Sequence, residues 1–256
     1  MTKHMLVPDA HAYPGDDFER FEMAGALALK ERPDVIINIG DLADMESLST
    51  YDVGKTGFEG RRYSKDIRAA RDALDAFDKP INKYNLRQKK NKKPQYKPRR
   101  VLTLGNHEER INRAISCDAK LEGTFSIEDL GYKEHGWDVR PFLQAIEIDG
   151  IYYNHYFVSG VMGRPISGEN PAKTICKKHM ESCTAGHAHI LDTACLTATG
   201  GRRVRGLVGG CFFEHHMPYA ASTEYMWWKG LLIKHDVVDG NYNLQEFSMD
   251  RLRKVL

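Results

Sequence analysis

The stretch Val101-Leu-Thr-Leu-Gly-Asn-His-Glu108 passes from a short apolar run through a glycine into three polar side chains. Apolar runs of this length, bounded by turn residues, are typical of buried strands in a sheet covered on both faces. A glycine at the strand end permits a sharp turn, which places the next side chains where open α/β sheets build their sites. The stretch therefore predicts a strand, a turn and a candidate site, in that order.

Two earlier segments repeat this pattern. Met5-Leu-Val7 leads into Asp9, and Val35-Ile-Ile-Asn-Ile39 leads into Gly40-Asp41. Apolar residues at helical spacing fill the gaps between the strands. The predicted helices are one capped by Asp16-Asp17 and ended before Pro33, one over Ser64–Asp78 ended near Pro80, and one from Asn170-Pro171 towards Met180.

The second half of the chain is rich in strand signals. Asp149-Gly150 and Asp239-Gly240 each separate two strand-like runs, and such dipeptides are strong hairpin signals. Alternating strands and helices followed by a strand-rich half predict an α/β fold in which two sheets pack face to face with helices outside. We expect one domain over residues 1–256, with a basic insertion at about residues 80–100.

The composition is that of an ordinary globular protein. Hydrophobic residues make up 41% and charged residues 28%, and the formal net charge is +2. No apolar run reaches the roughly 18 residues that a membrane-spanning helix needs. The five cysteines are odd in number and show no CxxC spacing. With strand-like sequence starting at once after Met1, these features predict a cytoplasmic protein without membrane contact.

The charge is unevenly distributed along the chain. Residues 55–100 hold 16 Lys and Arg against 5 Asp and Glu, and Lys83 to Arg100 alone holds nine basic residues and no acidic one. If this run flanks the site it would attract DNA or RNA by neutralising phosphates. Runs of this kind are also often solvated loops, so an insertion without substrate contact is the alternative.

Metal-ligand residue types recur in five short motifs. They supply carboxylate, imidazole and amide groups, which suit Mn²⁺ first and also Fe, Zn or Co. Two such ions, about 3.5 to 4 Å apart, ionise a bridging water near neutral pH and clamp a phosphoryl oxygen. The motifs are Asp9-Ala-His11, Gly40-Asp41, Gly105-Asn106-His107-Glu108, His155 and Gly186-His187-Ala188-His189.

One histidine is left over for proton transfer. His107 directly follows Asn106, so its side chain is expected beside the metals. A protonated imidazole there can donate to a leaving alkoxide, and Glu108 is the expected partner that orients the ring.

The motif order D-x-H, G-D, G-N-H-E, H, G-H-x-H resembles that of the calcineurin-like metallophosphoesterases. The matching positions run from Asp9 to His189. The stretches Arg99–Arg110 and Gly160–Pro165 also resemble phage-encoded and bacterial members, and a phage-encoded member would act in the host cytoplasm. The resemblance implies a four-layer αββα sandwich and a role for His107 as general acid or transition-state stabiliser. It implies that one metal is held by Asp9, His11, Asp41 and His189, and the other by Asp41, Asn106, His155 and His187.

One position departs from the protein phosphatases of that superfamily. They follow the second motif with G-D-x-x-D-R-G, whereas here Asp44 matches and Met45 stands at the arginine position. We therefore expect a phosphodiesterase acting on nucleic acid or nucleotides. The alternatives are a phosphomonoesterase acting on a small metabolite and a non-catalytic nucleic-acid-binding scaffold.

Other residues are weaker candidates. Arg110 and Arg164 could bind the substrate phosphate because arginine pairs bidentately with oxyanions. The pair His215-His216 could approach the site, but such pairs are mostly structural or exposed. Trp227-Trp228 is expected in the core or at an interface.

Overall fold

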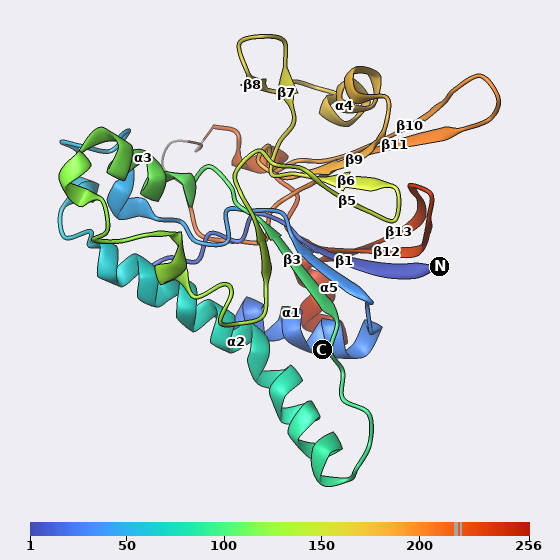
Figure 1. Cartoon of the computed structure of the whole chain (residues 1–256), viewed down its shortest axis with the longest axis horizontal. Coiled ribbons are helices and arrows are strands. Elements are labelled where there is room, and N and C mark those ends of the chain that lie inside the picture. Colours follow the sequence, from blue (N-terminus) through green and yellow to red (C-terminus); the bar gives the residue numbers. More distant parts are fainter. Residues whose placement is uncertain (218–219, 221) are drawn as a thin grey trace.

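Two β-sheets face each other in the computed structural model, which describes residues 1–217, 220 and 222–256 (Figure 1). The first sheet has the order β13 (Asn241–Ser248), β12 (Gly230–Val238), β1 (Thr2–Val7), β2 (Val35–Asn38), β3 (Arg99–Thr103) and β4 (Asp138–Arg140). Strands β1 to β4 run parallel to one another. Strand β12 is antiparallel to both of its neighbours, β1 and β13.

The second sheet is also mixed, with a parallel centre and antiparallel edges. Its order is β10 (Leu191–Thr197), β11 (Arg203–Gly209), β9 (Ser182–Ala185), β6 (Ile151–Tyr153) and β5 (Ile146–Ile148). A short ribbon of β7 (Val158–Ser159) and β8 (Arg164–Pro165) stands apart from both sheets.

Helices cover the outer faces of the sheets. Three of them, α1 (Glu19–Glu31), α2 (Tyr63–Lys90) and α5 (Met249–Val255), share an apolar core with the first sheet. On the second sheet lies α4 (Pro171–His179), and α3 (Glu109–Cys117) follows the third motif. No helix in the described part of the chain is long and apolar enough to cross a membrane.

The side chains of β1 show how the layers are held together. Met5 and Val7 face the helical core, and Leu6 between them faces the core between the two sheets. Alternate residues of a strand point to opposite faces, so a strand covered on both sides must be apolar throughout. The predicted αββα sandwich is thereby confirmed.

Both predicted hairpins are present. The turns at Asp149-Gly150 and Asp239-Gly240 have positive φ at both residues, with values of 54° and 81° in the first and 45° and 77° in the second. Such turns match the twist of the flanking strands.

The predicted end of the second helix is wrong. Helix α2 continues through Pro80 to Lys90. Phe77 and Ile81 on either side of the proline are buried in the same core, so packing outweighs the propensity cost of about 3 kcal/mol. At Gly25, α1 lies so close to the Phe77 carbonyl and the Pro80 ring that a Cβ atom would collide with both.

Candidate metal centre

The five motifs meet at the carboxyl ends of parallel strands. In the first sheet Asp9 follows β1, Asp41 follows β2, and Asn106 follows β3. In the second sheet His155 follows β6, and His187 with His189 follows β9. The two sheets therefore bring polar side chains from distant parts of the sequence to one place.

Among the residues that the structure describes, three groups of side chains are close enough to hold an ion, with one ligand atom from each residue and all atoms of a group within 4.8 Å of one another. The His189 Nε2 atom lies 3.2 Å from Asp9 Oδ2, and the His155 Nε2 atom lies 3.3 Å from Asp41 Oδ2. The groups are Asp9 with His11 and His189, Asp41 with His155 and His187, and His11 with Asp41 and His107.

The donor set fits divalent ions. His11 is fully buried, and its Nε2 atom has no hydrogen-bond partner among the described residues. An imidazole nitrogen without a partner in such a place costs free energy unless a ligand meets it. The atom lies 3.9 Å from Asp41 Oδ2, in a cluster of carboxylate and imidazole groups that Mn²⁺, Fe²⁺ and Zn²⁺ all bind.

Neighbouring groups orient the ring of His155. Its Nδ1 atom donates to the carbonyl oxygen of Ile39 at 2.9 Å, so in the neutral ring Nδ1 carries the proton and Nε2, which faces the cluster, is the nitrogen that can bind a metal. The Asn106 Oδ1 atom lies 2.9 Å from the same Nε2 atom. Asn106 is thus where the sequence predicts a neutral oxygen ligand.

Opposite charges in the cluster shift several pKa values. Burial raises the pKa of the Asp41 carboxyl, but the charges of His155 and His107 outweigh it and hold that pKa well below its usual value. Burial lowers the pKa of His155, yet Asp41 and Asp9 raise it to about 9. His155 is therefore protonated on both ring nitrogens at neutral pH, and the proton on Nε2 must leave before a metal binds there.

The backbone of the cluster is strained. Four of the predicted ligands adopt the left-handed conformation that residues other than glycine rarely enter. Strain of this kind concentrates where function requires a side chain in an unusual direction. The residues and their φ angles are His11 (43°), Asp41 (51°), His187 (68°) and His189 (59°).

Gly186 leaves room for a carboxylate. A Cβ atom at this position would collide with Asp9 Oδ1 and would lie 2.7 Å from the Ile39 Cγ2 atom. The amide nitrogen of the next residue, His187, lies 3.0 Å from Asp9 Oδ2, so the glycine lets this turn hold Asp9 in place.

Gly186→Ala is expected to weaken metal binding at least about tenfold and to destabilise the fold by about 1 to 3 kcal/mol, because Asp9 must move. Metal titration and thermal unfolding measure the two effects. The matched control is Gly57→Ala, since nothing lies within 4 Å of a Cβ atom there. Wild-type metal affinity in Gly186→Ala would contradict the assigned position of Asp9.

His107 is oriented by Asp44. The His107 Nδ1 atom lies 2.7 Å from the Asp44 carbonyl oxygen and 2.8 Å from Asp44 Oδ1. Two acceptors fix the proton on Nδ1 and leave Nε2 facing the cluster, 3.8 Å from Asp41 Oδ2. Burial lowers the pKa of His107, but the charge of Asp41 and the hydrogen bond to Asp44 raise it above its ordinary value.

Glu108 does not occupy the predicted position beside His107. Its carboxylate accepts hydrogen bonds from the backbone amides of Asp41, Ala43 and Gly105 and from the Tyr132 hydroxyl. Glu108 therefore ties the second motif to the third, and the pairing with His107 belongs to Asp44. The only sequence signal for Asp44 was its place three residues after Asp41.

Of the two arginines predicted to bind substrate, one reaches the cluster. Arg110 donates to the carbonyl oxygens of Asp44 and Met45, at 2.9 and 3.3 Å, and its Nη2 atom lies 3.2 Å from His107 Nε2. Arg164 is exposed in β8, and no described contact joins it to the cluster. Met45 stands at the position where the protein phosphatases have an arginine, and Arg110 from α3 places a guanidinium beside it.

Two aromatic side chains near the cluster were expected to be structural. The His215 ring lies 6.5 Å from the His11 ring and packs on Tyr13, and neither of its ring nitrogens has a hydrogen-bond partner among the described residues. The Trp227 ring lies 4.6 Å from that of His189. Each ring therefore packs beside a predicted metal ligand.

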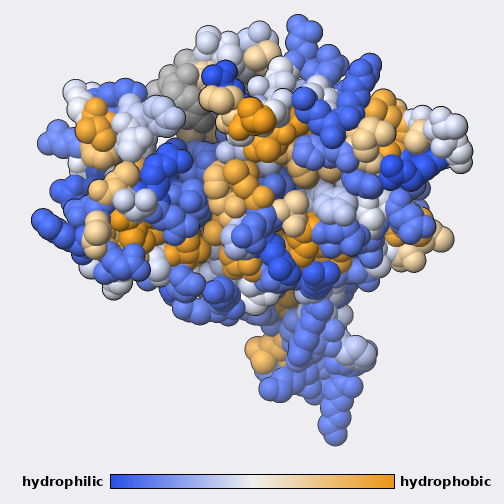
Figure 2. Space-filling view, turned by 45° about the horizontal axis from the view of Figure 1, so that its top comes forward, coloured by the Kyte–Doolittle hydropathy of each residue, from blue (hydrophilic) through white to orange (hydrophobic). Residues whose placement is uncertain are grey.

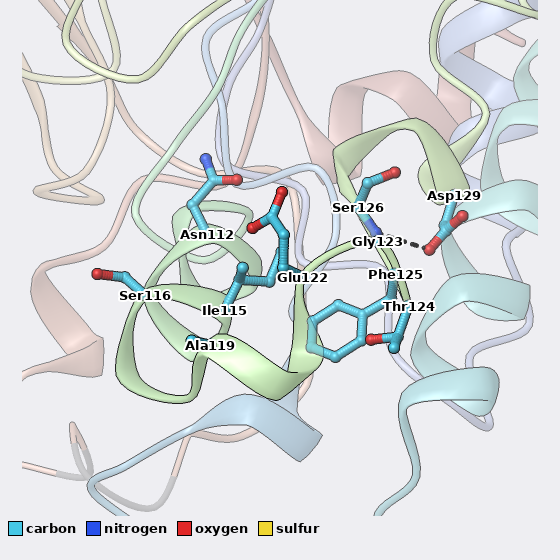
Figure 3. Close-up of a pocket in the computed structure, with 10 residues that line it drawn as sticks. All are labelled: Asn112, Ile115, Ser116, Ala119, Glu122, Gly123, Thr124, Phe125, Ser126 and Asp129. Carbon is cyan, nitrogen blue, oxygen red and sulfur yellow. Dashed lines mark hydrogen bonds between the residues drawn. The ribbon is translucent and has the colours of Figure 1, made fainter.

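A cavity of about 860 Å³ is lined by α3 and the segment that follows it (Figure 3). None of the predicted metal ligands lines it, so it does not belong to the metal centre. Asn112, Ile115 and Ser116 line it from one face of the helix. Residues three or four apart share a helix face, so Arg110, which contacts His107, points away from this cavity.

Comparisons with known proteins give distant structural matches. No family model matches the chain, and no curated protein matches it. Among solved structures it is similar to YfcE, a phosphoesterase from E. coli, with 11% identity, a TM-score of 0.38 and coverage of 96% of this chain and 99% of that one. It is also similar to TT1561 of Thermus thermophilus, with 11% identity, a TM-score of 0.41 and coverage of 96% and 98%. Since these values are low, the chemistry of the site is inferred from its own residues.

Proposed function

We propose that the chain is a phosphoesterase that works with two divalent metal ions, preferably Mn²⁺. Its substrates are phosphodiesters of nucleic acids or nucleotides. One observation supports this most: Asp41 belongs to two of the three groups that can hold an ion. A carboxylate shared by two groups is the ligand that a two-metal site requires. The proposed ligands are Asp9, His11, Asp41, Asn106, His155, His187 and His189.

The metals, when bound, would supply a nucleophile at neutral pH and a clamp for the phosphoryl oxygens. The residues of the chain hold and move protons. Asp44 keeps His107 oriented with Nε2 towards the cluster, and a proton on Nε2 is available to the leaving oxygen. The Arg110 Nη2 atom lies 3.2 Å from the same Nε2 atom. When Nε2 carries a proton both atoms are donors, so together they can contact one phosphate oxygen.

The charge of the site favours a diester over a monoester. A phosphomonoester carries a charge of about −1.5 to −2 at neutral pH, and a diester carries −1. Among the described lysines and arginines, Arg110 is the one that is hydrogen-bonded or ion-paired to a side chain of the cluster. The proposed metals would attract either ester, so the two esters differ in what they need from the fixed cations beside the metals, and a single arginine suits the smaller charge of a diester.

Paired chromogenic substrates test the proposal. With Mn²⁺, the chain should hydrolyse bis-p-nitrophenyl phosphate faster than p-nitrophenyl phosphate, and EDTA should abolish both rates. A faster monoester reaction would assign the chain to phosphomonoesterases. A panel of single- and double-stranded DNA, RNA and cyclic nucleotides would then identify the class of substrate.

Asp44→Asn is expected to slow turnover by about 10- to 100-fold and to change its pH dependence. A reaction that depends on a proton donor slows as the pH rises through the pKa of that donor. Since the Asp44 carboxylate raises the pKa of His107, its removal lowers that pKa, and the alkaline loss of kcat should begin at a lower pH. A kcat profile from pH 5 to 10 measures this.

Asp66→Asn is the control for Asp44→Asn. Its carboxylate is also buried nearby but binds Ser47 instead of a histidine. It should leave the alkaline limb of the profile in place. An unshifted limb in Asp44→Asn would show that Asp44 does not act through the proton on His107.

A further inference from the structure

The carboxyl-terminal end of α2 and the loop that follows it in the sequence form an arm that projects from the body of the molecule (Figure 1). We call residues 83–98 the basic arm. It holds seven lysines and arginines and no acidic residue. Figure 2 shows it as an almost wholly hydrophilic protrusion.

The charges of the basic arm have no acidic partners in the described structure. All seven basic side chains are exposed, and none of them forms an ion pair or a side-chain hydrogen bond. Arg87 alone contacts an aromatic ring, with its guanidinium 5.6 Å from the Tyr84 ring centroid. At the base of the arm the situation differs, because Arg100 lies 2.7 Å from Asp78 Oδ1. The helix dipole favours the charges at the end of α2, but it does not reach the loop that carries Lys92, Lys93 and Lys97.

Specific contacts hold the arm in shape. The Asn85 side chain bonds to both the amide and the carbonyl of Tyr96, at 2.8 Å each, and the Tyr96 hydroxyl donates to the Pro33 carbonyl. The Arg32 guanidinium lies over the rings of Tyr84 and Tyr96, at 4.2 and 4.9 Å. Both aromatic rings are therefore engaged, which leaves charge, not base stacking, as the means of binding.

The basic arm lies far from the metal centre. It leads into the first residue of β3, Arg99, whereas the third motif follows the last residue of that strand. Along α2, Lys90 is about 36 Å from Asp66, at about 1.5 Å per residue. Asp66 bonds Ser47, three residues beyond Asp44. The hypothesis that this basic run flanks the catalytic cleft is therefore wrong.

We infer that the basic arm is a separate nucleic-acid-binding surface, which contacts the phosphate backbone of a duplex. Cations without acidic partners, spread along a protrusion, match the evenly spaced phosphates of a duplex, because a phosphate contact requires only a positive charge. An acidic protein partner would need an apolar or aromatic contact core, and Leu86 is the one large hydrophobic residue exposed on the arm. This inference goes beyond the proposed function and does not depend on it.

Salt-dependent DNA binding tests the inference. The triple variant Lys89→Gln, Lys92→Gln, Lys93→Gln is compared with Lys173→Gln, Lys177→Gln, Lys178→Gln, which removes three exposed charges from α4. Binding of the full chain to a labelled 20-base-pair duplex is followed by fluorescence anisotropy in EDTA. The slope of log affinity against log salt should fall by about two to three in the arm variant only, since each phosphate contact contributes about 0.9. Between 50 and 200 mM salt the wild-type affinity should then fall about fortyfold more than that of the arm variant.

The outcomes separate this inference from the proposed function. Equal slopes for the wild type and the arm variant would overturn the inference. Binding of polyglutamate through the arm without binding of DNA would also overturn it, because it would assign the arm to an acidic protein. Both triple variants should keep the wild-type rate on bis-p-nitrophenyl phosphate. A chain that binds DNA through the arm but hydrolyses no phosphoester would refute the proposed function alone.

Discussion

Replacing Asp41 by asparagine is expected to lower phosphodiester hydrolysis by at least about a thousandfold. The Asp41 Oδ2 atom lies within 3.9 Å of Nε2 atoms of His155, His107 and His11, so an amide nitrogen there would turn a donor towards the metal sites. The loss of a shared ligand removes several kcal/mol of transition-state stabilisation. Rates on bis-p-nitrophenyl phosphate at saturating Mn²⁺, with metal analysis of the same sample, measure the effect.

Asp78→Asn is the control for this variant. Asp78 is also a buried aspartate with basic partners, but these are Arg100 and His135, away from the metal centre. Its rate should stay within about threefold of the wild type. If Asp41→Asn kept full activity and its metal, the shared position of Asp41 would be wrong.

His107→Ala is expected to keep both metal ions and to lose about 10²- to 10⁴-fold in kcat, as removal of a general acid does. His107 also belongs to one of the groups that can hold an ion, so the structure permits a second role as a ligand. Metal analysis separates the two roles. Two ions per chain with slow turnover support proton transfer, whereas loss of an ion would make His107 a ligand.

A leaving group of low pKa gives an independent test of the same role. Such a group departs without a proton, so His107→Ala should lose much less activity on a nitrophenyl diester than on a diester with an alkyl leaving group. The ratio of the two kcat values, measured for wild type and variant, reports this. An equal loss on both substrates would contradict proton donation by His107.

Much of the architecture could be predicted because it depends on local patterns. The apolar runs at Met5–Val7 and Val101–Leu104 are continuous because their strands are covered on both faces. The hairpins depended on two-residue turns with positive φ. The end of α2 was missed because a local helix breaker, Pro80, is outweighed by burial of residues far apart in the sequence.

The sequence predicted which residues offer donor atoms to a metal, but not which neighbours each of these residues contacts. A motif gives the order of side chains along the chain, but not which neighbour each one contacts. Glu108 is adjacent to His107 in sequence and yet binds backbone amides, while Asp44 reaches the ring from another strand end. In the same way, Met45 lacks the arginine that a linear motif requires, and α3 supplies Arg110 beside it.

The position of the basic run could not be predicted from composition. Charge density alone is compatible with a cleft wall and with a distant arm. Its place follows from the topology, because α2 returns the chain to the amino end of β3 and the metal centre lies at the carboxyl end.

The number of metal ions per chain tests the account most directly. The full chain, stripped with EDTA, reloaded with Mn²⁺ and freed of excess metal, is measured by inductively coupled plasma mass spectrometry against protein concentration. The shared position of Asp41 between two groups predicts two ions per chain in the wild type and fewer than two in Asp41→Asn. A wild-type value of one ion or less per chain would contradict the two-metal centre.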